Sequence, residues 1–402
     1  MLTALAASAA GLLAAHEFLA RGSGRGGGAW RWARRGVLLL LLVVTAIGAD
    51  RAGLQARLGH LVSRERETRS PVLDGTGDPF LVRQAEAQVP VHPYPEGRGR
   101  EAIEAWQRET RDAVRARARF AVAADQPSEV TVVSREAVGD VTRTLVTFRA
   151  ADGTPLPAFV HEPTRGGRRA GILVVPGHGR GARATAGMVG KDYQHGAALE
   201  LARRGFVTIT PELRGFGLLS STGAPMHRAV AATALQSGTF YKAVVVDDLG
   251  RALTVLSRWQ GVDPARLGVA GASLGGEIAV MLAVVDDRVR VVASQSYGGD
   301  TGPARVAGND DDEAEQTPHG CHTFPGINTL LWQEDWFRLL APRAVLVSRG
   351  RTNTPRKADA FKVIVGRAYA DVGQADRFTF AVEPGGHEFF VEPVAAFFER
   401  WL

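Results

Sequence analysis

Short apolar runs alternate with amphipathic stretches along most of the chain after residue 170. Six runs of four or five residues, rich in Val, Ile, Leu, Phe and Ala, are flanked by turn-forming or polar residues. Such runs are typical of strands buried on both faces of a parallel sheet. They cover residues 171–175, 206–210, 267–270, 289–293, 344–347 and 378–382.

Stretches with helical periodicity separate these runs. The clearest covers residues 246–259, where apolar residues recur every three or four positions. The others cover residues 193–204, 276–285, 355–370 and 391–402. This alternation predicts an α/β fold with a mostly parallel sheet and helices on both faces. Ligands bind at the carboxyl ends of strands in such sheets, so the residues just after the apolar runs are the first candidates for a site.

Three earlier runs predict strands of a different kind. Residues 129–133, 141–148 and 156–160 are rich in β-branched residues, and Gly139-Asp140 and Asp152-Gly153 form turn signals between them. Short connections of this type favour antiparallel pairing at the start of the sheet. Before them, residues 101–120 have a helical pattern with charges on most turns.

The N-terminal segment has the features of an export signal or a membrane anchor. Residues 37–49 form an apolar run of 13 residues, preceded by Arg34-Arg35. A spanning helix needs roughly 20 apolar residues, whereas a signal-peptide core needs about 7–15. Both interpretations place the rest of the protein outside the cytoplasm, either exported or membrane-anchored. We therefore divide the chain into a signal or anchor segment (1–50), a Pro-containing linker or wrapping arm (51–100), and an α/β domain (101–402).

The distribution of charge argues against a nucleic-acid enzyme. The chain is 45% hydrophobic and 22% charged, with a net charge of +6. Residues 1–120 carry 18 Arg and 12 acidic residues, so the whole excess lies there and the remainder is neutral. A nucleic-acid enzyme is expected to have a basic stripe near its site. The single cysteine, Cys321, excludes an intrachain disulfide.

Ser273 is the strongest candidate for a nucleophile. It lies in Gly271-Ala272-Ser273-Leu274-Gly275, directly after the run 267–270 and at the start of a helical stretch. In a strand–turn–helix context this pattern presents a serine on a strained turn, and its flanking glycines avoid clashes with the neighbouring strand and helix. The backbone N–H of Leu274 is then placed to bind an oxyanion.

Two histidines follow other strand runs and complete a hydrolytic site. His387 lies in Gly385-Gly386-His387, between the last strand run and the last helix, which is the position of the general base in a Ser-then-His order. His178 lies in a Gly-rich turn after the run 171–175, and its backbone N–H is the expected second oxyanion donor.

Taken together, these features resemble the α/β-hydrolase superfamily, nearest its dienelactone-hydrolase-like and acetyl-xylan-esterase-like bacterial members. The resemblance extends from about residue 101 to residue 402. It implies ester hydrolysis through an acyl-enzyme without a cofactor, on acylated sugars or other small esters. Its motifs are PGHG (176–179), LARRGFVTITPELRGFG (201–217), VDPARLGVAGASLGG (262–276), HGCHTFPGI (319–327), LLAPRAVLVSRG (339–350) and GGHEFF (385–390).

The acidic member of the triad departs from this family pattern. Such relatives carry an Asp in a Gly-x-x-Asp setting after the strand 344–347, where this chain has Gly350-Arg351-Thr352-Asn353. An amide can orient an imidazole, but it cannot stabilise imidazolium as a carboxylate does. Three interpretations remain open: Asn353 orients His387, Asp300 has taken over as the acid, or the protein is an impaired or binding-only member.

The remaining clusters carry less weight. Residues 310–313 are acidic, and His319, Cys321 and His322 follow in the same loop. We interpret them as a solvated loop and a structural turn, and we expect no metal. The expected partner is a small-molecule ester, with no nucleic acid, possible membrane anchoring through the N-terminus, and an oligomeric state that the sequence does not indicate. The rival functions are a non-catalytic envelope protein and, more weakly, a serine peptidase.

Overall fold

The computed structural model describes residue 84 and residues 87–118, 129–222, 226–303 and 320–402. They fall in one of the two units of the chain, Gly77–Leu402. The predicted signal or anchor segment (1–50) lies outside the described residues, as do residues 51–83 of the predicted arm. Within the described ranges, no helix is both long and apolar enough to traverse a lipid bilayer.

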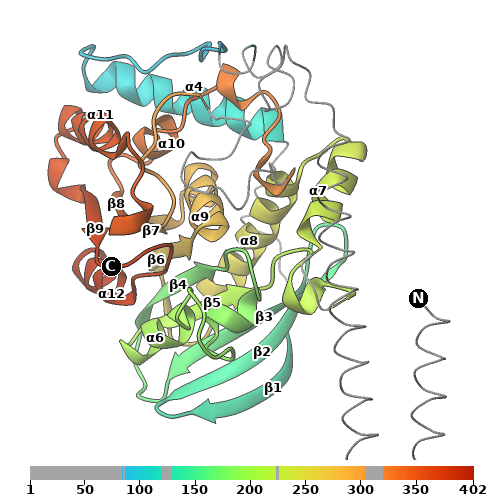
Figure 1. The fold of residues 1–402 in the computed structure, drawn as a ribbon. Helices are drawn as coiled ribbons and strands as arrows, with labels where there is room; N and C mark the ends of the chain where they lie inside the picture. Colours follow the sequence, from blue (N-terminus) through green and yellow to red (C-terminus); the bar gives the residue numbers. More distant parts are fainter. Residues whose placement is uncertain (1–83, 85–86, 119–128, 223–225, 304–319) are drawn as a thin grey trace, which may run out of the picture. The chain divides into compact units, whose positions relative to one another are not determined.

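The described residues form a nine-stranded sheet in the order β1-β2-β3-β5-β4-β6-β7-β8-β9 (Figure 1). The pairs β1/β2, β2/β3 and β3/β5 are antiparallel, and all other pairs are parallel. The strands are β1 (Thr131–Val138), β2 (Val141–Arg149), β3 (Pro155–Pro163), β4 (Arg169–Val175), β5 (Val207–Pro211), β6 (Val262–Ala272), β7 (Val289–Gln295), β8 (Ala344–Gly350) and β9 (Phe378–Glu383).

Helices cover both faces of this sheet. Side chains alternate between the faces of a strand, so Leu173 and Val175 of β4 pack in one core while Ile172 and Val174 pack in another. Helices α8 and α9 contribute to the first core, and helices α6 and α12 to the second. The helices are α4 (Arg100–Ala118), α5 (Ala182–Thr185), α6 (Ala197–Arg203), α7 (His227–Gln236), α8 (Tyr241–Ser257), α9 (Leu274–Val285), α10 (Asp335–Arg338), α11 (Ala358–Asp371) and α12 (Val391–Trp401), with short 3-10 turns η1 (Gly217–Leu219), η2 (Gly320–His322), η3 (Ile327–Thr329), η4 (Arg351–Asn353) and η5 (Ala375–Arg377).

This architecture confirms the predicted fold: all six apolar runs are strands of the parallel part, and the three earlier runs form the antiparallel part. Several boundaries differ. Strand β6 begins at Val262 because Arg169 and Ala170 of β4 pair with Val262 and Asp263 before a register shift. Helix α6 begins only at Ala197, because His195 and Gly196 have positive φ angles of 49° and 62°.

Other helix boundaries also differ from the prediction. Helix α8 begins at Tyr241 and helix α11 at Ala358, rather than at residues 246 and 355. Helix α7 was not predicted. Its Ala-rich sequence buries only His227, Ala231 and Ala234, so it has little apolar periodicity to detect.

Part of the predicted arm packs on residues of the predicted α/β domain. Trp106 of α4 donates from its indole N–H to the carbonyl of His92 over 2.8 Å, and Trp332 donates to the carbonyl of Gln88 over 3.3 Å. Arg338 lies 3.3 Å from a carboxylate oxygen of Glu96. Residues 88–96 therefore contact α4 and residues beyond 330, whereas the division at residue 100 stays a prediction.

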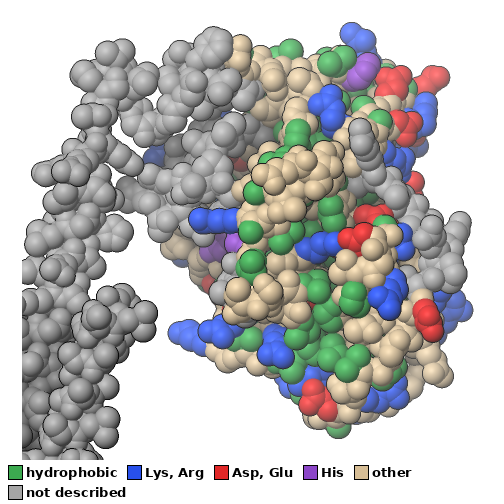
Figure 2. All heavy atoms as spheres, turned by 90° about the vertical axis from the view of Figure 1, so that its right-hand side faces the viewer, with side chains coloured by type: hydrophobic (Ala, Val, Ile, Leu, Met, Phe, Trp, Pro, Cys, Tyr) green, Lys and Arg blue, Asp and Glu red, His purple; other side chains and the backbone are tan. Residues whose placement is uncertain are grey.

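The surface of the domain mixes both signs of charge. On the face shown in Figure 2, basic and acidic side chains are interspersed among apolar and polar ones. The described part of this face has no extended basic field of the kind that nucleic-acid binding requires.

Candidate active site

Ser273 occupies a sharp turn between β6 and α9. Its backbone has φ 60° and ψ −127°, a conformation that residues with a side chain rarely adopt. Strain of this kind persists only when the surrounding structure enforces it, and it concentrates at functional sites. The turn lies at the carboxyl end of a central parallel strand, as the sequence predicts for a nucleophile.

The glycines beside Ser273 are required by close backbone contacts. A Cβ atom on Gly271 would lie 2.3 Å from the carbonyl oxygen of Gly275, and one on Gly275 would lie 2.2 Å from the carbonyl oxygen of Val175. Neither backbone oxygen can move without breaking the strand or the helix to which it belongs. The expected steric reason for the glycines is therefore confirmed.

The loop after β4 lies against the turn that carries Ser273. A Cβ atom on Gly177 would be only 2.5 Å from the carbonyl oxygen of Ala272. The loop is held by two hydrogen bonds: the Gly177 N–H donates to Oε1 of Gln194 over 2.7 Å, and the Tyr193 hydroxyl donates to the carbonyl of His178 over 2.8 Å. The backbone of His178 is thus fixed beside the nucleophile turn.

Leu274 is the first residue of α9 and is fully buried. The N–H groups in the first turn of a helix have no acceptor within the helix, and the helix dipole makes this end partly positive. Leu274 thus begins the helix beside the loop that carries His178, and the role of their N–H groups as two oxyanion donors stays a prediction.

His387 follows β9 and precedes α12, and its side chain is exposed. Its Nδ1 lies 3.2 Å from Oδ1 of Asn353, which ends the turn η4 after β8. Arg349 donates to the backbone carbonyl of Asn353 over 2.8 Å and so holds this turn in place. A hydrogen bond from Nδ1–H to the amide oxygen leaves Nε2 as the proton acceptor, which is the tautomer that a general base requires.

Backbone contacts bring His387 and Ser273 to the same edge of the sheet. The Ser273 N–H donates to the carbonyl of Gln295, and the next residue, Ser296, exchanges two hydrogen bonds of 3.1 Å with the backbone of Glu388. Among the described residues, however, the Ser273 hydroxyl makes no hydrogen bond to the His387 ring. Catalytic hydrogen bonds are often long in a free enzyme and shorten only with substrate bound.

Asp300, the alternative acid, is engaged elsewhere. Its Oδ1 accepts from the Thr301 N–H over 2.8 Å and lies 3.8 Å from the ammonium of Lys357. The structure therefore places Asn353, and not Asp300, beside Nδ1 of His387.

Tyr193 is a site residue that the sequence pattern does not reveal. The pattern places it in a helix, but it precedes α6 in a loop and contacts both halves of the site. Its ring centroid lies 5.6 Å from that of His387, and its hydroxyl binds the His178 carbonyl. Gly196 is the sequence feature that indicates the loop, because a glycine three residues after Tyr193 favours a helix that begins only after it.

The sequence analysis also missed a buried charged cluster on α9. Glu277 is hydrogen-bonded to the Lys242 ammonium and, over 2.6 Å, to Nδ1 of His322. Burial alone would raise the pKa of Glu277, but Lys242 and His322 outweigh it and lower that pKa to about 2. A lone acidic residue in the apolar stretch 274–285 was the available signal.

The surroundings of Arg214 and Cys321 limit the chemistry of both side chains. Arg214 forms paired hydrogen bonds with Asp248 and contacts Asp152 over 2.6 Å, so its guanidinium holds a turn. Burial and the nearby charge of Glu277 raise the pKa of the Cys321 thiol to about 12. A thiol with such a pKa is a poor nucleophile at neutral pH.

Comparisons with known proteins agree with the fold. The acetyl xylan esterase family (AXE1) matches residues 142–298, which include His178, Ser273 and Leu274 but neither Asn353 nor His387. No curated protein matches the chain. The acetyl-xylan-esterase part of the predicted resemblance is confirmed.

Solved structures of similar fold include several esterases. One from Bacteroides fragilis NCTC 9343, assigned as an acetyl xylan esterase, has 17% identity and a TM-score of 0.65 over 79% of this chain and 84% of its own. A glucuronoyl esterase from Solibacter usitatus has 14% identity and a TM-score of 0.54 over 78% and 97% of the two chains. A CE15 glucuronoyl esterase from Teredinibacter turnerae T7901 has 16% identity and a TM-score of 0.53 over 83% and 94%. At these identities the likeness establishes the α/β-hydrolase fold.

Proposed function

We propose that this α/β-hydrolase, part of which matches the acetyl xylan esterase family, is a serine hydrolase that cleaves carboxylic esters of acylated sugars. The observation that carries the proposal is the strained turn at Ser273, at the carboxyl end of β6 and beside the loop that holds His178. The family match and the esterase structures of similar fold support the reaction class.

Each residue of the site has a distinct role in the proposed reaction. His387 removes the proton of the Ser273 hydroxyl, and the serine oxygen attacks the ester carbonyl. The backbone N–H groups of Leu274 and His178 bind the oxyanion of the tetrahedral intermediate. His387 then protonates the leaving alcohol, and water hydrolyses the acyl-enzyme by the same sequence in reverse.

Asn353 sets the strength of the base. Its amide oxygen orients the His387 ring at 3.2 Å but carries no charge to stabilise imidazolium. Replacing the carboxylate of a buried triad by an amide can lower turnover by about four orders of magnitude. His387 is exposed, so solvent replaces part of that stabilisation and the loss is smaller here. The enzyme is therefore expected to be active but slower than relatives that have an acid at this position.

The N-terminal sequence supports a reaction outside the cytoplasm. The apolar run 37–49 and the preceding arginines fit an export signal or an anchor, and an acylated polysaccharide or its fragments would be available there. The segment lies outside the described residues, so this part of the proposal depends on the sequence alone.

A serine-directed fluorophosphonate probe tests the proposal. We expect labelling of the wild type, loss of labelling in Ser273→Ala, and unchanged labelling in Ser237→Ala, which alters an exposed serine at the end of α7. Hydrolysis is then measured with acetylated xylan, a methyl glucuronoyl ester and p-nitrophenyl acetate. The relative rates show whether the enzyme prefers acetyl esters of sugars or glucuronoyl esters. A folded wild type that neither reacts with the probe nor hydrolyses any of these esters would refute the proposed activity.

A further inference from the structure

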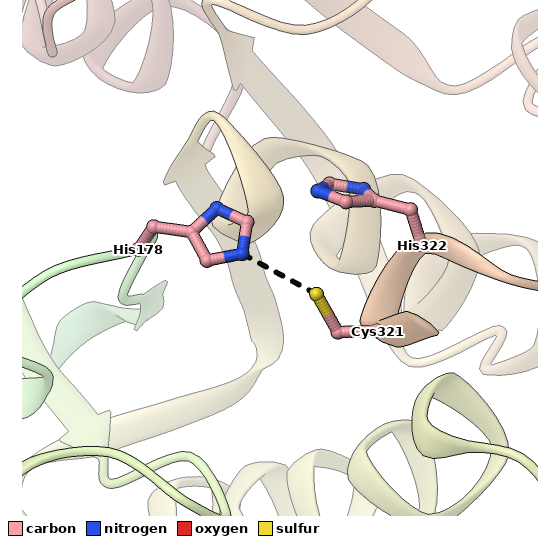
Figure 3. Close-up of side chains that lie close together, drawn as sticks. All are labelled: His178, Cys321 and His322. Carbon is pink, nitrogen blue, oxygen red and sulfur yellow. Dashed lines mark hydrogen bonds between the residues drawn. The ribbon is translucent and has the colours of Figure 1, made fainter. Parts of the chain in front are cut away.

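Three metal-ligating side chains from distant parts of the chain converge beside the loop after β4. His178, Cys321 and His322 each offer one donor atom, and these atoms lie within 4.8 Å of one another (Figure 3). Nε2 of His178 is 3.3 Å from Sγ of Cys321. Two donors of these types that share a tetrahedral zinc ion are about 3.5 Å apart, given Zn–S and Zn–N lengths of roughly 2.3 and 2.0 Å.

The fold brings the three residues together from two elements. His178 follows β4, whereas Cys321 and His322 lie in η2, 143 residues further along the chain. Figure 3 shows the two imidazoles and the thiol on facing sides of one small space. Cys321 is buried, whereas 41% of the His322 side chain is exposed. An ion can therefore reach the cluster from the solvent-exposed side on which His322 lies.

A carboxylate orients one of these ligands. Glu277 lies 2.6 Å from Nδ1 of His322, so a proton on that nitrogen is donated to the carboxylate, and Nε2 then carries the lone pair that a metal ion would bind. Carboxylate–histidine–metal arrangements of this kind fix the tautomer and increase the basicity of the ligand. The other oxygen of Glu277 binds Lys242, which keeps the carboxylate in place.

The second histidine is held by aromatic packing. The His178 ring centroid lies 4.8 Å from that of His227 and 5.8 Å from that of Phe216, and the last two rings are stacked. Its position is further limited by the Tyr193 hydroxyl, which binds the His178 carbonyl. The two imidazoles and the thiol are therefore positioned by surroundings that are already in place.

Contrary to the expectation from the sequence, we propose that His178, Cys321 and His322 bind one Zn²⁺ ion, with the fourth position open to water. Two imidazoles and one thiolate are a ligand set that favours zinc over Mg²⁺ or Ca²⁺, which prefer oxygen. On binding, the Cys321 sulfur exchanges its proton for a bond to the metal, and the proton leaves to solvent. The ion connects η2 to the loop that carries His178, and so braces one of the two proposed oxyanion donors.

Cobalt substitution tests the site on the full chain. Purified protein is stripped with a chelator and titrated with Co²⁺, and then with Zn²⁺ in competition. We expect one Co²⁺ per chain, with the near-ultraviolet absorption of a thiolate–cobalt bond and the intense visible bands of tetrahedral geometry, both removed by an equivalent of Zn²⁺.

Variants assign the signal to the cluster. Cys321→Ser should abolish the thiolate absorption, and His322→Gln should weaken Co²⁺ binding at least about 100-fold, because it removes a direct ligand rather than an outer partner. The control His92→Gln alters an exposed histidine outside the cluster and should bind as the wild type does. Circular dichroism in the chelator verifies that each variant is folded.

The proposal is wrong if the folded wild type binds no Co²⁺ or Zn²⁺ at micromolar free ion, or binds it without a thiolate signal. It is equally wrong if Cys321→Ser and His322→Gln bind as tightly as the wild type, or if His92→Gln loses binding to the same extent. Because the readout is metal binding and spectroscopy, it does not depend on the esterase activity.

Discussion

Asn353→Asp is expected to accelerate ester hydrolysis by this protein. The substitution replaces an amide oxygen, 3.2 Å from Nδ1 of His387, by a carboxylate oxygen of nearly the same shape. The imidazolium that forms when His387 takes the serine proton then gains a charged partner. The hydrogen bond itself is retained, so the change isolates the effect of charge.

Coulomb's law bounds the size of this effect. At 3.2 Å, two unit charges interact by about 5 kcal/mol at an effective dielectric constant of about 20, and by about 1.3 kcal/mol at that of water. Because His387 is exposed, the true value lies toward the lower bound. We therefore expect kcat/KM to rise by about 10- to 100-fold, since about 1.4 kcal/mol corresponds to a factor of ten.

The assay measures kcat/KM for p-nitrophenyl acetate between pH 5 and 9. The carboxylate stabilises the protonated ring of His387, so we expect the acid limb of the pH–rate profile to move to higher pH in the variant. Asn353→Ala removes the acceptor and should lower kcat/KM by about 5- to 10-fold. Asp300→Asn, which alters a residue paired with Lys357, should change it by less than about 2-fold. A folded Asn353→Asp variant with unchanged or lower kcat/KM at every pH would show that His387 is not oriented through Asn353.

Three further predictions follow from the packing around the site. Tyr193→Phe keeps the ring beside His387 but removes the 2.8 Å hydrogen bond to the His178 carbonyl, and it should lower stability by about 1 kcal/mol and reduce kcat/KM. Gly275→Ala places a Cβ 2.2 Å from the carbonyl oxygen of Val175 and should cost about 1–3 kcal/mol in urea unfolding, whereas the control Gly250→Ala meets no atom within 4 Å in helix α8 and should stabilise by about 0.5–1 kcal/mol. The pKa of Glu277 is about 2 in the folded protein and about 4.3 in an unfolded chain, so its ionised form contributes about 3 kcal/mol above pH 5 that is lost as the pH falls toward 2. The difference in unfolding free energy between wild type and Glu277→Gln should shrink by that amount over this range, and a constant difference would contradict the pKa.

The alternation of apolar runs and amphipathic stretches was enough to predict the fold. Buried parallel strands need apolar side chains on both faces, so β4 to β9 stand out as runs in the sequence. The predictions that failed concern elements whose boundaries depend on backbone conformation or partner strands. Helix α6 is delayed by the left-handed backbone at His195 and Gly196, and β6 is extended by its pairing with Arg169.

The sequence by itself predicted the nucleophile turn, because a serine between two glycines, directly after an apolar run and before a helical stretch, is typical of such a turn. The clash that excludes a side chain at Gly275 involves the carbonyl oxygen of Val175, which only the tertiary structure brings close. The family resemblance further predicted an amide, Asn353, at the position of the triad acid. Only the tertiary structure decided that Asn353 rather than Asp300 meets His387, and that Glu277, His322 and Cys321 lie beside His178. These contacts join segments from about 30 to more than 140 residues apart, and they depend on where strand ends and loops meet in space, which no local pattern of residues encodes.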